Sequence, residues 1–181
     1  MKASSVNDIK QELKTLSHPQ LLELCLRLAR FKKENKELLT YLLFEAGDIE
    51  GYRISVKKEI EEGFSTINTT NIYFAKKGLR KVLRSTNKYI RYAGCKETEV
   101  DLLICFCTQW KDSNVPVSKT TALSNLYQAQ QKKIFTALAL IHEDLQHDYI
   151  AQLSKLEEKQ TPVKEKTVRL GKVVSFLGIR L

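Results

Sequence analysis

Glycine and proline are scarce in this chain of 181 residues, which contains 7 Gly and 3 Pro. These two residues supply the unusual or fixed backbone angles that tight turns use. A β-sandwich or barrel needs many such turns, so the scarcity excludes these folds and favours long helices. The other values, 43% hydrophobic and 28% charged residues, are ordinary for a globular protein and exclude wholesale disorder.

Long apolar runs are also missing, because no stretch reaches the roughly 18 to 20 residues that cross a bilayer. The opening segment MKASSVNDIKQEL is too polar for a signal peptide. The four cysteines are Cys25, Cys95, Cys105 and Cys107, and they fall short of the density of a secreted disulfide scaffold. The sequence therefore predicts no transmembrane segment, reduced thiols and a cytoplasmic location.

Side chains that bind metals or carry out catalysis form no recognisable pattern. On a helix, Cys105 and Cys107 point about 200° apart, so they cannot share a metal ion from one face. His142 and His147 point about 140° apart, with the same consequence. The phosphate-binding patterns G-x-x-x-x-G-K-S/T and G-x-G-x-x-G are absent, as is the nucleophile elbow G-x-S-x-G. We expect no metal, no cofactor and no enzymatic activity.

The net charge of +9 is concentrated in two segments of the chain. Residues 1–62 contain 11 basic and 11 acidic side chains, and residues 119–159 contain 5 of each. Residues 63–118 contain 9 basic and 4 acidic side chains, and residues 160–181 contain 5 and 1, so these two segments hold +5 and +4. No Asp or Glu occurs from Gly63 to Lys96, which makes this stretch a candidate site for a negatively charged partner.

Apolar residues recur at spacings of three and four along most of the chain, which is typical of amphipathic helices. Ser17 and Gln20 predict a capping box that starts a helix, and Gly94 predicts the end of another helix. We predict an all-α fold of six or seven helices, in a bundle or a short α-solenoid, with a single helical domain over residues 1–159. Before residue 112, helices are expected at about 5–15, 18–31, 38–44, 49–67, 71–93 and 97–111.

The last helix is expected to be long. No Gly or Pro occurs from Val117 to Thr161, and apolar residues continue at helical spacing to Leu156. An unbroken helix from Lys119 to Lys159 would extend roughly 60 Å at 1.5 Å per residue, which is longer than a compact domain of this size needs. Two explanations stay open: a hidden break in the helix, or a helix that projects to meet another subunit.

Six cations between residues 77 and 91 fall within an arc of about 100° when each residue turns the helix by 100°. We call this set the basic stripe: Lys77, Arg80, Lys81, Arg84, Lys88 and Arg91. Apolar residues such as Leu79 and Leu83 fall on the opposite side, so the helix can bury one face and present the cations on the other. A row of Lys and Arg on a rigid helix can neutralise regularly spaced phosphates and release counterions.

Less specific interpretations of these basic segments stay open. Charge runs are common on solvated helix faces, and Glu59, Glu61 and Glu62 on the preceding helix can pair with the basic stripe. Residues 160–181 form a basic apolar tail of unassigned structure. This tail suits an anionic membrane surface, a groove on a partner, nucleic acid or the protein's own core.

Two functions follow from these patterns. In the first, the protein is a non-catalytic helical binding protein whose basic stripe binds nucleic acid or another polyanion, mainly through phosphate contacts. In the second, it is a protein–protein scaffold or homo-oligomer that uses the long last helix and the tail.

Three segments look like sequence from small, uncharacterised helical bacterial proteins. They are FKKENKELLTYLLFE at Phe31–Glu45, YIRYAGC at Tyr89–Cys95 and HEDLQHDY at His142–Tyr149. The resemblance covers about the first 150 residues. It implies a helical fold, but it carries no assigned activity and no functional residue.

Overall fold

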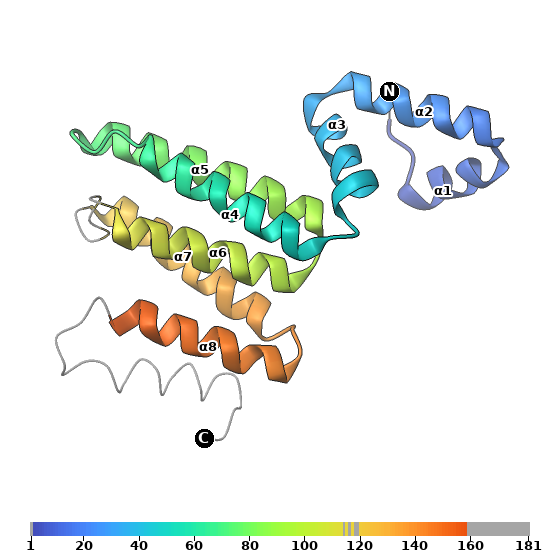
Figure 1. Cartoon of the computed structure of the whole chain (residues 1–181). Helices are drawn as coiled ribbons and strands as arrows, with labels where there is room; N and C mark the ends of the chain where they lie inside the picture. Colours follow the sequence, from blue (N-terminus) through green and yellow to red (C-terminus); the bar gives the residue numbers. More distant parts are fainter. Residues whose placement is uncertain (1, 114, 116, 118–119, 159–181) are drawn as a thin grey trace. The chain divides into compact units, whose positions relative to one another are not determined.

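The computed structural model describes residues 2–113, 115, 117 and 120–158, and over these residues the chain is helical without strands (Figure 1). The predicted all-α class is confirmed. The described chain contains eight α-helices and one π-helical turn, so the predicted count of six or seven helices is wrong. Contacts within the chain define two compact units, one from Met1 to Gly47 and one that begins at Asp48.

The first unit consists of α1 (Val6–Thr15), α2 (His18–Phe31), α3 (Lys33–Thr40) and the π-helical turn Tyr41–Glu45. Ser5 caps α1, because its Oγ accepts the N–H of Asp8 while its own N–H donates to Asp8 Oδ2, both at 3.2 Å. At the start of α2, the N–H of Ser17 donates to Gln20 Oε1 at 2.8 Å. Both helices therefore start where their capping residues predict.

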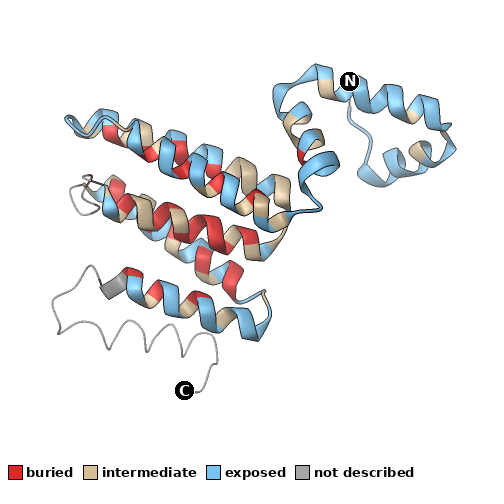
Figure 2. Ribbon diagram, viewed as in Figure 1, coloured by how far each residue is buried: buried red, intermediate tan, exposed pale blue. Residues whose placement is uncertain are grey.

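Most of the apolar surface of the first unit is exposed. Apolar side chains cover roughly 220° of the circumference of α2 at 100° per residue, yet no residue of this helix is buried (Figure 2). Among the described residues of the unit, only Tyr41 is buried. The large apolar side chains left exposed are Val6, Ile9, Leu22, Leu24, Leu26, Leu28, Phe31, Leu42, Leu43 and Phe44. An exposed apolar surface of this extent is typical of a contact site for another molecule.

The second unit contains α4 (Ile49–Ser65), α5 (Ile72–Ala93), α6 (Lys96–Asp112), α7 (Thr121–Leu138) and α8 (Glu143–Glu158). Helix α6 is central, because the other four helices all pack against it. Nine of its 17 residues are buried, including the consecutive residues Leu102, Leu103 and Ile104 (Figure 2). This burial on several sides explains why α6 lacks a single apolar stripe.

Trp110 occupies the core between α6 and α7. Its side chain is fully buried, and its Nε1 donates a hydrogen bond to the carbonyl of Val115 at 3.1 Å. Its ring centroid lies 5.9 Å from that of Phe106 and 5.5 Å from that of Tyr127, both in edge-on geometry. The ring of Phe106 lies 5.2 Å from that of Phe64 on α4. These aromatic contacts link α4, α6 and α7.

The expected long helix over residues 119–159 is wrong, because α7 ends at Leu138 and α8 begins at Glu143. The hidden break is the explanation that the structure shows. A tight turn ends α7, since the N–H of Leu140 donates to the carbonyl of Ala137 at 3.0 Å. The break allows both α7 and α8 to pack against α6, which one straight helix could not do.

The basic apolar tail of residues 160–181 lies outside the described residues. The single helical domain over residues 1–159 stays a prediction beside the two compact units. Within the described helices, none has both the length and the apolar character that a membrane span requires.

Candidate nucleic-acid interface

Helix α5 is held by caps at both ends and by burial of one face. At its start, Asn71 Oδ1 accepts the N–H of Tyr73 at 2.8 Å. At its end, Gly94 has a φ of 67°, a left-handed conformation that favours glycine, and its N–H donates to the carbonyl of Ile90 at 3.0 Å. The buried face contains Ala75, Leu79, Val82, Leu83 and Thr86. Packing of this face against α4 and α6 turns the opposite face outward.

The basic stripe lies on the outward face of α5. Five of its members are exposed, namely Lys77, Arg80, Lys81, Arg84 and Arg91, and Lys88 is half-buried. None of the five exposed cations forms an ion pair with a carboxylate of the described residues. Over this part of the chain, their charge is left to interact with solvent or with an external anion.

The carboxylates of α4 do not neutralise the basic stripe. Glu59 accepts a hydrogen bond from the hydroxyl of Tyr89, and Glu61 accepts one from Gln109 Nε2 at 3.4 Å. Glu62 is exposed. Among the residues that the structure describes, none of the three glutamates pairs with a cation of the basic stripe. A solvated surface therefore remains the alternative to anion binding.

Lys88 is held against two aromatic rings near the end of the basic stripe. Its Nζ lies 4.8 Å from the ring centroid of Tyr89 and 5.9 Å from that of Tyr92. The two rings are 6.2 Å apart in edge-on geometry. These distances are in the range of cation–π attraction, which restricts the position of the lysine.

A pocket of about 580 Å³, which we call the basic pocket, lies where α5, α6 and α7 meet. Its charged lining residues are Arg84, Arg91, Lys96, Lys133 and Glu99. Four cations and one carboxylate give this lining a formal charge of +3. Lys96 Nζ lies 2.7 Å from Glu99 Oε2, and Lys133 Nζ donates to Asn87 Oδ1 at 3.4 Å. A multivalent anion such as a phosphate group matches this charge.

The periodicity of α5 does not identify two cations of the basic pocket, Lys96 and Lys133, because they lie on α6 and α7. The position of Lys96 just after Gly94 is a local signal that could have found it, since the short α5–α6 turn keeps it near the end of the basic stripe. No local signal places Lys133 there, because its position depends on how α7 packs in the unit.

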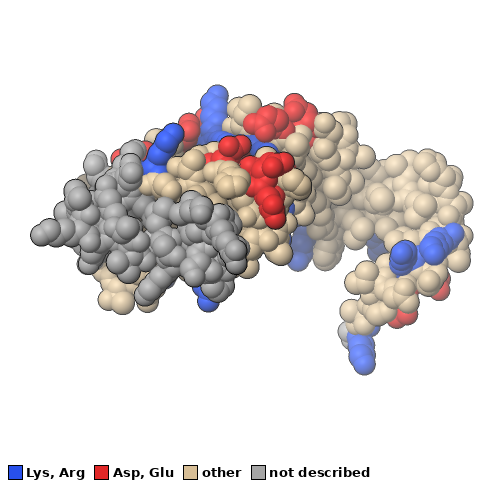
Figure 3. Space-filling model, turned by 90° about the horizontal axis from the view of Figure 1, so that it is seen from below, with Lys and Arg blue, Asp and Glu red and all other residues tan. Residues whose placement is uncertain are grey.

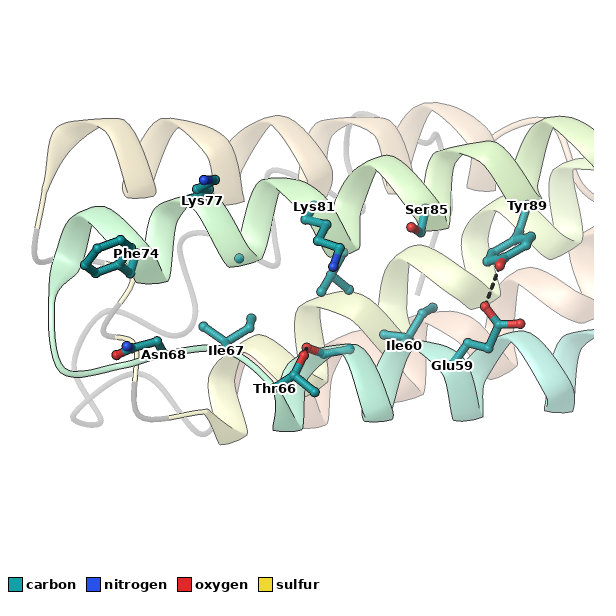
Figure 4. A pocket seen from close by; sticks show the side chains of 13 residues that line it. Glu59, Ile60, Thr66, Ile67, Asn68, Phe74, Lys77, Lys81, Ser85 and Tyr89 are labelled. Atoms are coloured by element: carbon teal, nitrogen blue, oxygen red, sulfur yellow. Dashed lines mark hydrogen bonds between the residues drawn. The ribbon is translucent and has the colours of Figure 1, made fainter. Parts of the chain in front are cut away.

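A second hollow, which we call the slot, lies between α4 and α5 on the other side of the basic stripe (Figure 4). Its volume is about 320 Å³. Ile60, Ile67 and Val82 give it apolar walls, and Lys77 and Lys81 of the basic stripe also line it. The slot is formed by side chains of two helices and the connection between them, so helix periodicity alone does not predict it.

The groups with shifted pKa values lie outside the basic stripe. Burial raises the pKa of Cys105 to about 11 and that of Cys107 to about 12, and burial also raises the pKa of Tyr149. For Arg53, burial acts to lower the pKa, but the hydrogen bond to Glu97 at 3.1 Å and nearby charges outweigh it, so this pKa is raised. Thiols that stay protonated in this way are poor nucleophiles.

No metal centre is formed within the described part of the chain, where no three His, Cys, Asp or Glu side chains gather closely enough to hold an ion. Figure 3 shows the molecule from below, where acidic side chains gather on the second unit with Lys and Arg side chains beside them. Glu143, Asp144 and Asp148 of α8 are exposed. Figure 1 shows α5 and α8 on opposite sides of α6 and α7, so these carboxylates are not on a helix next to α5.

No family model, no curated protein and no solved structure matches the chain. The resemblance to small helical bacterial proteins therefore stays a prediction.

Proposed function

We propose that the protein is a non-catalytic binding protein that holds nucleic acid or another polyanion on the basic stripe. The observation that carries this proposal is the exposure of five stripe cations with no ion-pair partner among the described carboxylates. Lys133 adds positive charge beside the stripe, in the basic pocket, where Lys96 is paired with Glu99. Exposed, unneutralised cations in a row are the electrostatic pattern of a phosphate-binding surface.

The dimensions of the basic stripe suit a nucleic-acid backbone. From Lys77 to Arg91 it extends for about 21 Å at 1.5 Å per residue. One DNA strand carries a charge for about every 3.4 Å of helix axis, so a segment of this length faces roughly six phosphates. Each neutralised phosphate releases counterions, which favours binding and makes it weaker as salt increases. Such contacts do not read the base sequence.

Fluorescence anisotropy with labelled single- and double-stranded DNA and RNA, in a salt series, tests the proposal. The test variant changes four stripe cations to alanine: Arg80, Arg84, Lys88 and Arg91. The control variant changes four exposed cations elsewhere to alanine: Arg30, Lys58, Lys132 and Lys155. Both variants lose the same formal charge, so a difference between them reports position rather than net charge.

The salt slope is the slope of the logarithm of the binding constant against the logarithm of the salt concentration. We expect a negative salt slope for the wild type, and a slope that is shallower by roughly 3 to 4 in the stripe variant, because each lost phosphate contact removes about 0.7 to 0.9. The control variant should keep most of the wild-type slope. Equal loss in both variants, or no binding by the wild type near physiological salt, contradicts the proposal. Circular dichroism checks that both variants are folded.

Protein–protein association is a second candidate, and the exposed apolar surface of the first unit favours it. The long last helix no longer supports it, because α8 buries Tyr149, Leu153 and Leu156. The exposed side chains of α2 support it instead, with Phe31 at 75% exposure. A second copy of the chain or another protein would cover this surface.

Light scattering over a range of protein concentrations tests this candidate. The test variant is Leu24→Gln, Leu28→Gln and Phe31→Gln, on the apolar arc of α2. The control variant is Glu23→Gln, Arg27→Gln and Arg30→Gln, on the polar arc of the same helix. A wild-type mass that rises with concentration, is lost in the first variant and is kept in the second supports homo-oligomerisation. A strict monomer contradicts it.

A further inference from the structure

We infer that the slot between α4 and α5 receives a base of single-stranded nucleic acid while the adjoining phosphates lie on the basic stripe. This inference rests on the proposed function, because the basic stripe supplies the electrostatic part of the binding. It adds a second kind of contact, which distinguishes an unpaired strand from a duplex and from a simple polyanion.

The volume and the lining of the slot suit a small, mostly apolar group. The slot volume of about 320 Å³ is in the range of small-molecule sites, which are mainly apolar with a few polar groups. Ile60, Ile67 and Val82 form the apolar part, and Ser85 and Asn68 are polar groups on the lining. A nucleobase has the same combination of an apolar face and hydrogen-bonding edges.

Two glycines allow α4 and α5 to come together beside the slot. A Cβ atom on Gly63 would lie 3.0 Å from Val82 Cγ2, and one on Gly78 would lie 3.0 Å from Ile67 Cγ1. The side chains that approach these glycines, Val82 and Ile67, are themselves part of the slot lining. The apolar side chains of Val82 and Ile67 are therefore packed directly against the backbone at Gly63 and Gly78.

The charge around the slot is arranged for a base with its phosphate. Lys77 and Lys81 belong both to the basic stripe and to the slot lining, so a phosphate next to a bound base would meet them. Figure 4 shows Lys81 directed from α5 toward the gap between the helices. Glu59, the one carboxylate in the lining, accepts a hydrogen bond from the hydroxyl of Tyr89. This pair lies at the end of the slot opposite Phe74 (Figure 4).

One aromatic ring, that of Phe74, lines the slot at the end nearest the start of α5, and Tyr73 lies beside it. Phe74 lines the slot and is 49% exposed, and Tyr73 beside it is 67% exposed. Their ring centroids lie 5.5 Å apart in edge-on geometry. Exposed aromatic rings beside a row of cations are the features with which proteins hold single strands, since each unpaired base offers a face for stacking.

A duplex cannot make the same contact without disruption. Its bases are paired and stacked inside the helix, and turning one outward costs a few kcal/mol. A single strand offers unpaired bases without that cost. Occupation of the slot therefore predicts a preference for single strands, whereas the basic stripe alone would accept any polyphosphate backbone.

Binding of an oligo-dT strand and of an abasic DNA strand of equal length tests the inference on the wild-type protein. Both strands have the same phosphates, so the basic stripe treats them alike. We expect the abasic strand to bind about tenfold more weakly, since the stacking of one base on a protein side chain changes the affinity by about this factor or more. Ser85→Leu fills the slot with an aliphatic side chain from an exposed position on α5, adds no ring on which a base could stack, and should remove this difference while leaving the salt slope unchanged. Ser55→Leu, at an exposed serine of α4 outside the slot lining, is the matched control and should keep the difference.

The outcomes separate this inference from the proposed function. Equal binding of the two strands, with a salt slope that depends on the stripe, overturns the slot inference and leaves the basic stripe as a general polyanion surface. A difference between strands that persists in Ser85→Leu also overturns it, because the base would then be bound elsewhere. Failure of both strands to bind overturns both proposals.

Discussion

The Nζ atom of Lys57 lies 2.7 Å from Asp101 Oδ2, so an ion pair joins α4 to α6 in the second unit. The Asp101 side chain is 11% exposed, and that of Lys57 is 34% exposed. The pair is therefore largely shielded from water on its acidic side. Removal of the lysine would leave a nearly buried carboxylate without its cation, which costs more than loss of a surface pair.

We expect Lys57→Met to lower the free energy of unfolding by about 1 to 3 kcal/mol, the usual range for a buried group that loses its charged partner. Urea unfolding followed by circular dichroism measures the change. Lys58→Met is the matched control, because the neighbouring Lys58 is exposed and should change the free energy of unfolding by less than about 0.5 kcal/mol. Similar effects of the two substitutions would show that the ion pair contributes little.

Trp110 gives a direct optical test of the core, because it is the one tryptophan of the chain and is fully buried. We expect its fluorescence in the native protein to be shifted to the blue and to resist quenching by iodide. Unfolding in urea should remove both properties. A native protein whose tryptophan is readily quenched would contradict the packing of Trp110 against Phe106 and Tyr127.

The basic pocket predicts that Lys133 takes part in phosphate binding although it lies on α7. Lys133→Ala should reduce the salt slope of DNA binding by roughly 1, as expected for one lost phosphate contact, and lower affinity similarly for different sequences. Lys132→Ala is the control, because Lys132 is exposed on the same helix but does not line the pocket. Equal effects of the two substitutions would contradict a specific role for the pocket.

Helix α5 shows what local sequence determines. Its capping residue Asn71, its apolar face and its terminal Gly94 all lie within the segment, so the expected range of 71–93 agrees with the observed helix Ile72–Ala93. The positions of the six stripe cations on one face follow from the same periodicity. The sequence could not show whether these cations are exposed, because exposure depends on the helices that pack around α5.

The break after Leu138 shows what local sequence leaves open. No Gly or Pro ends α7, and the apolar spacing continues across the turn into α8. Glu143 and Asp144 in the first turn of α8 are favourable at a helix N-terminus, but they are equally compatible with a continuous helix surface. The turn is favoured by packing of both helices against α6, and the same packing brings Lys133 to the basic pocket. The slot is also a product of packing, between α4 and α5.

The four cysteines should differ in reactivity according to their burial. Cys25 is exposed, Cys95 and Cys105 are half-buried, and Cys107 is buried. Burial raises the pKa of Cys105 to about 11 and that of Cys107 to about 12, from an ordinary 9.0, so both thiols remain protonated near pH 8. Labelling of the native protein with a thiol reagent at pH 8 should therefore modify Cys25 first and leave Cys105 and Cys107 protected until the protein unfolds.

The pH dependence of stability follows from the same shifts. A thiol whose pKa is raised by folding stabilises the native state fully below pH 9, and this stabilisation is lost as the pH rises from about 9 to between 11 and 12. Peptide mapping after native labelling at increasing pH measures how the reactivity of each buried thiol rises as the thiol ionises. The substitution Cys25→Ser removes the fast site for this measurement. Rapid labelling of Cys107 at pH 8 in the folded protein would contradict the burial of this α6 residue, because burial is what raises the pKa of its thiol.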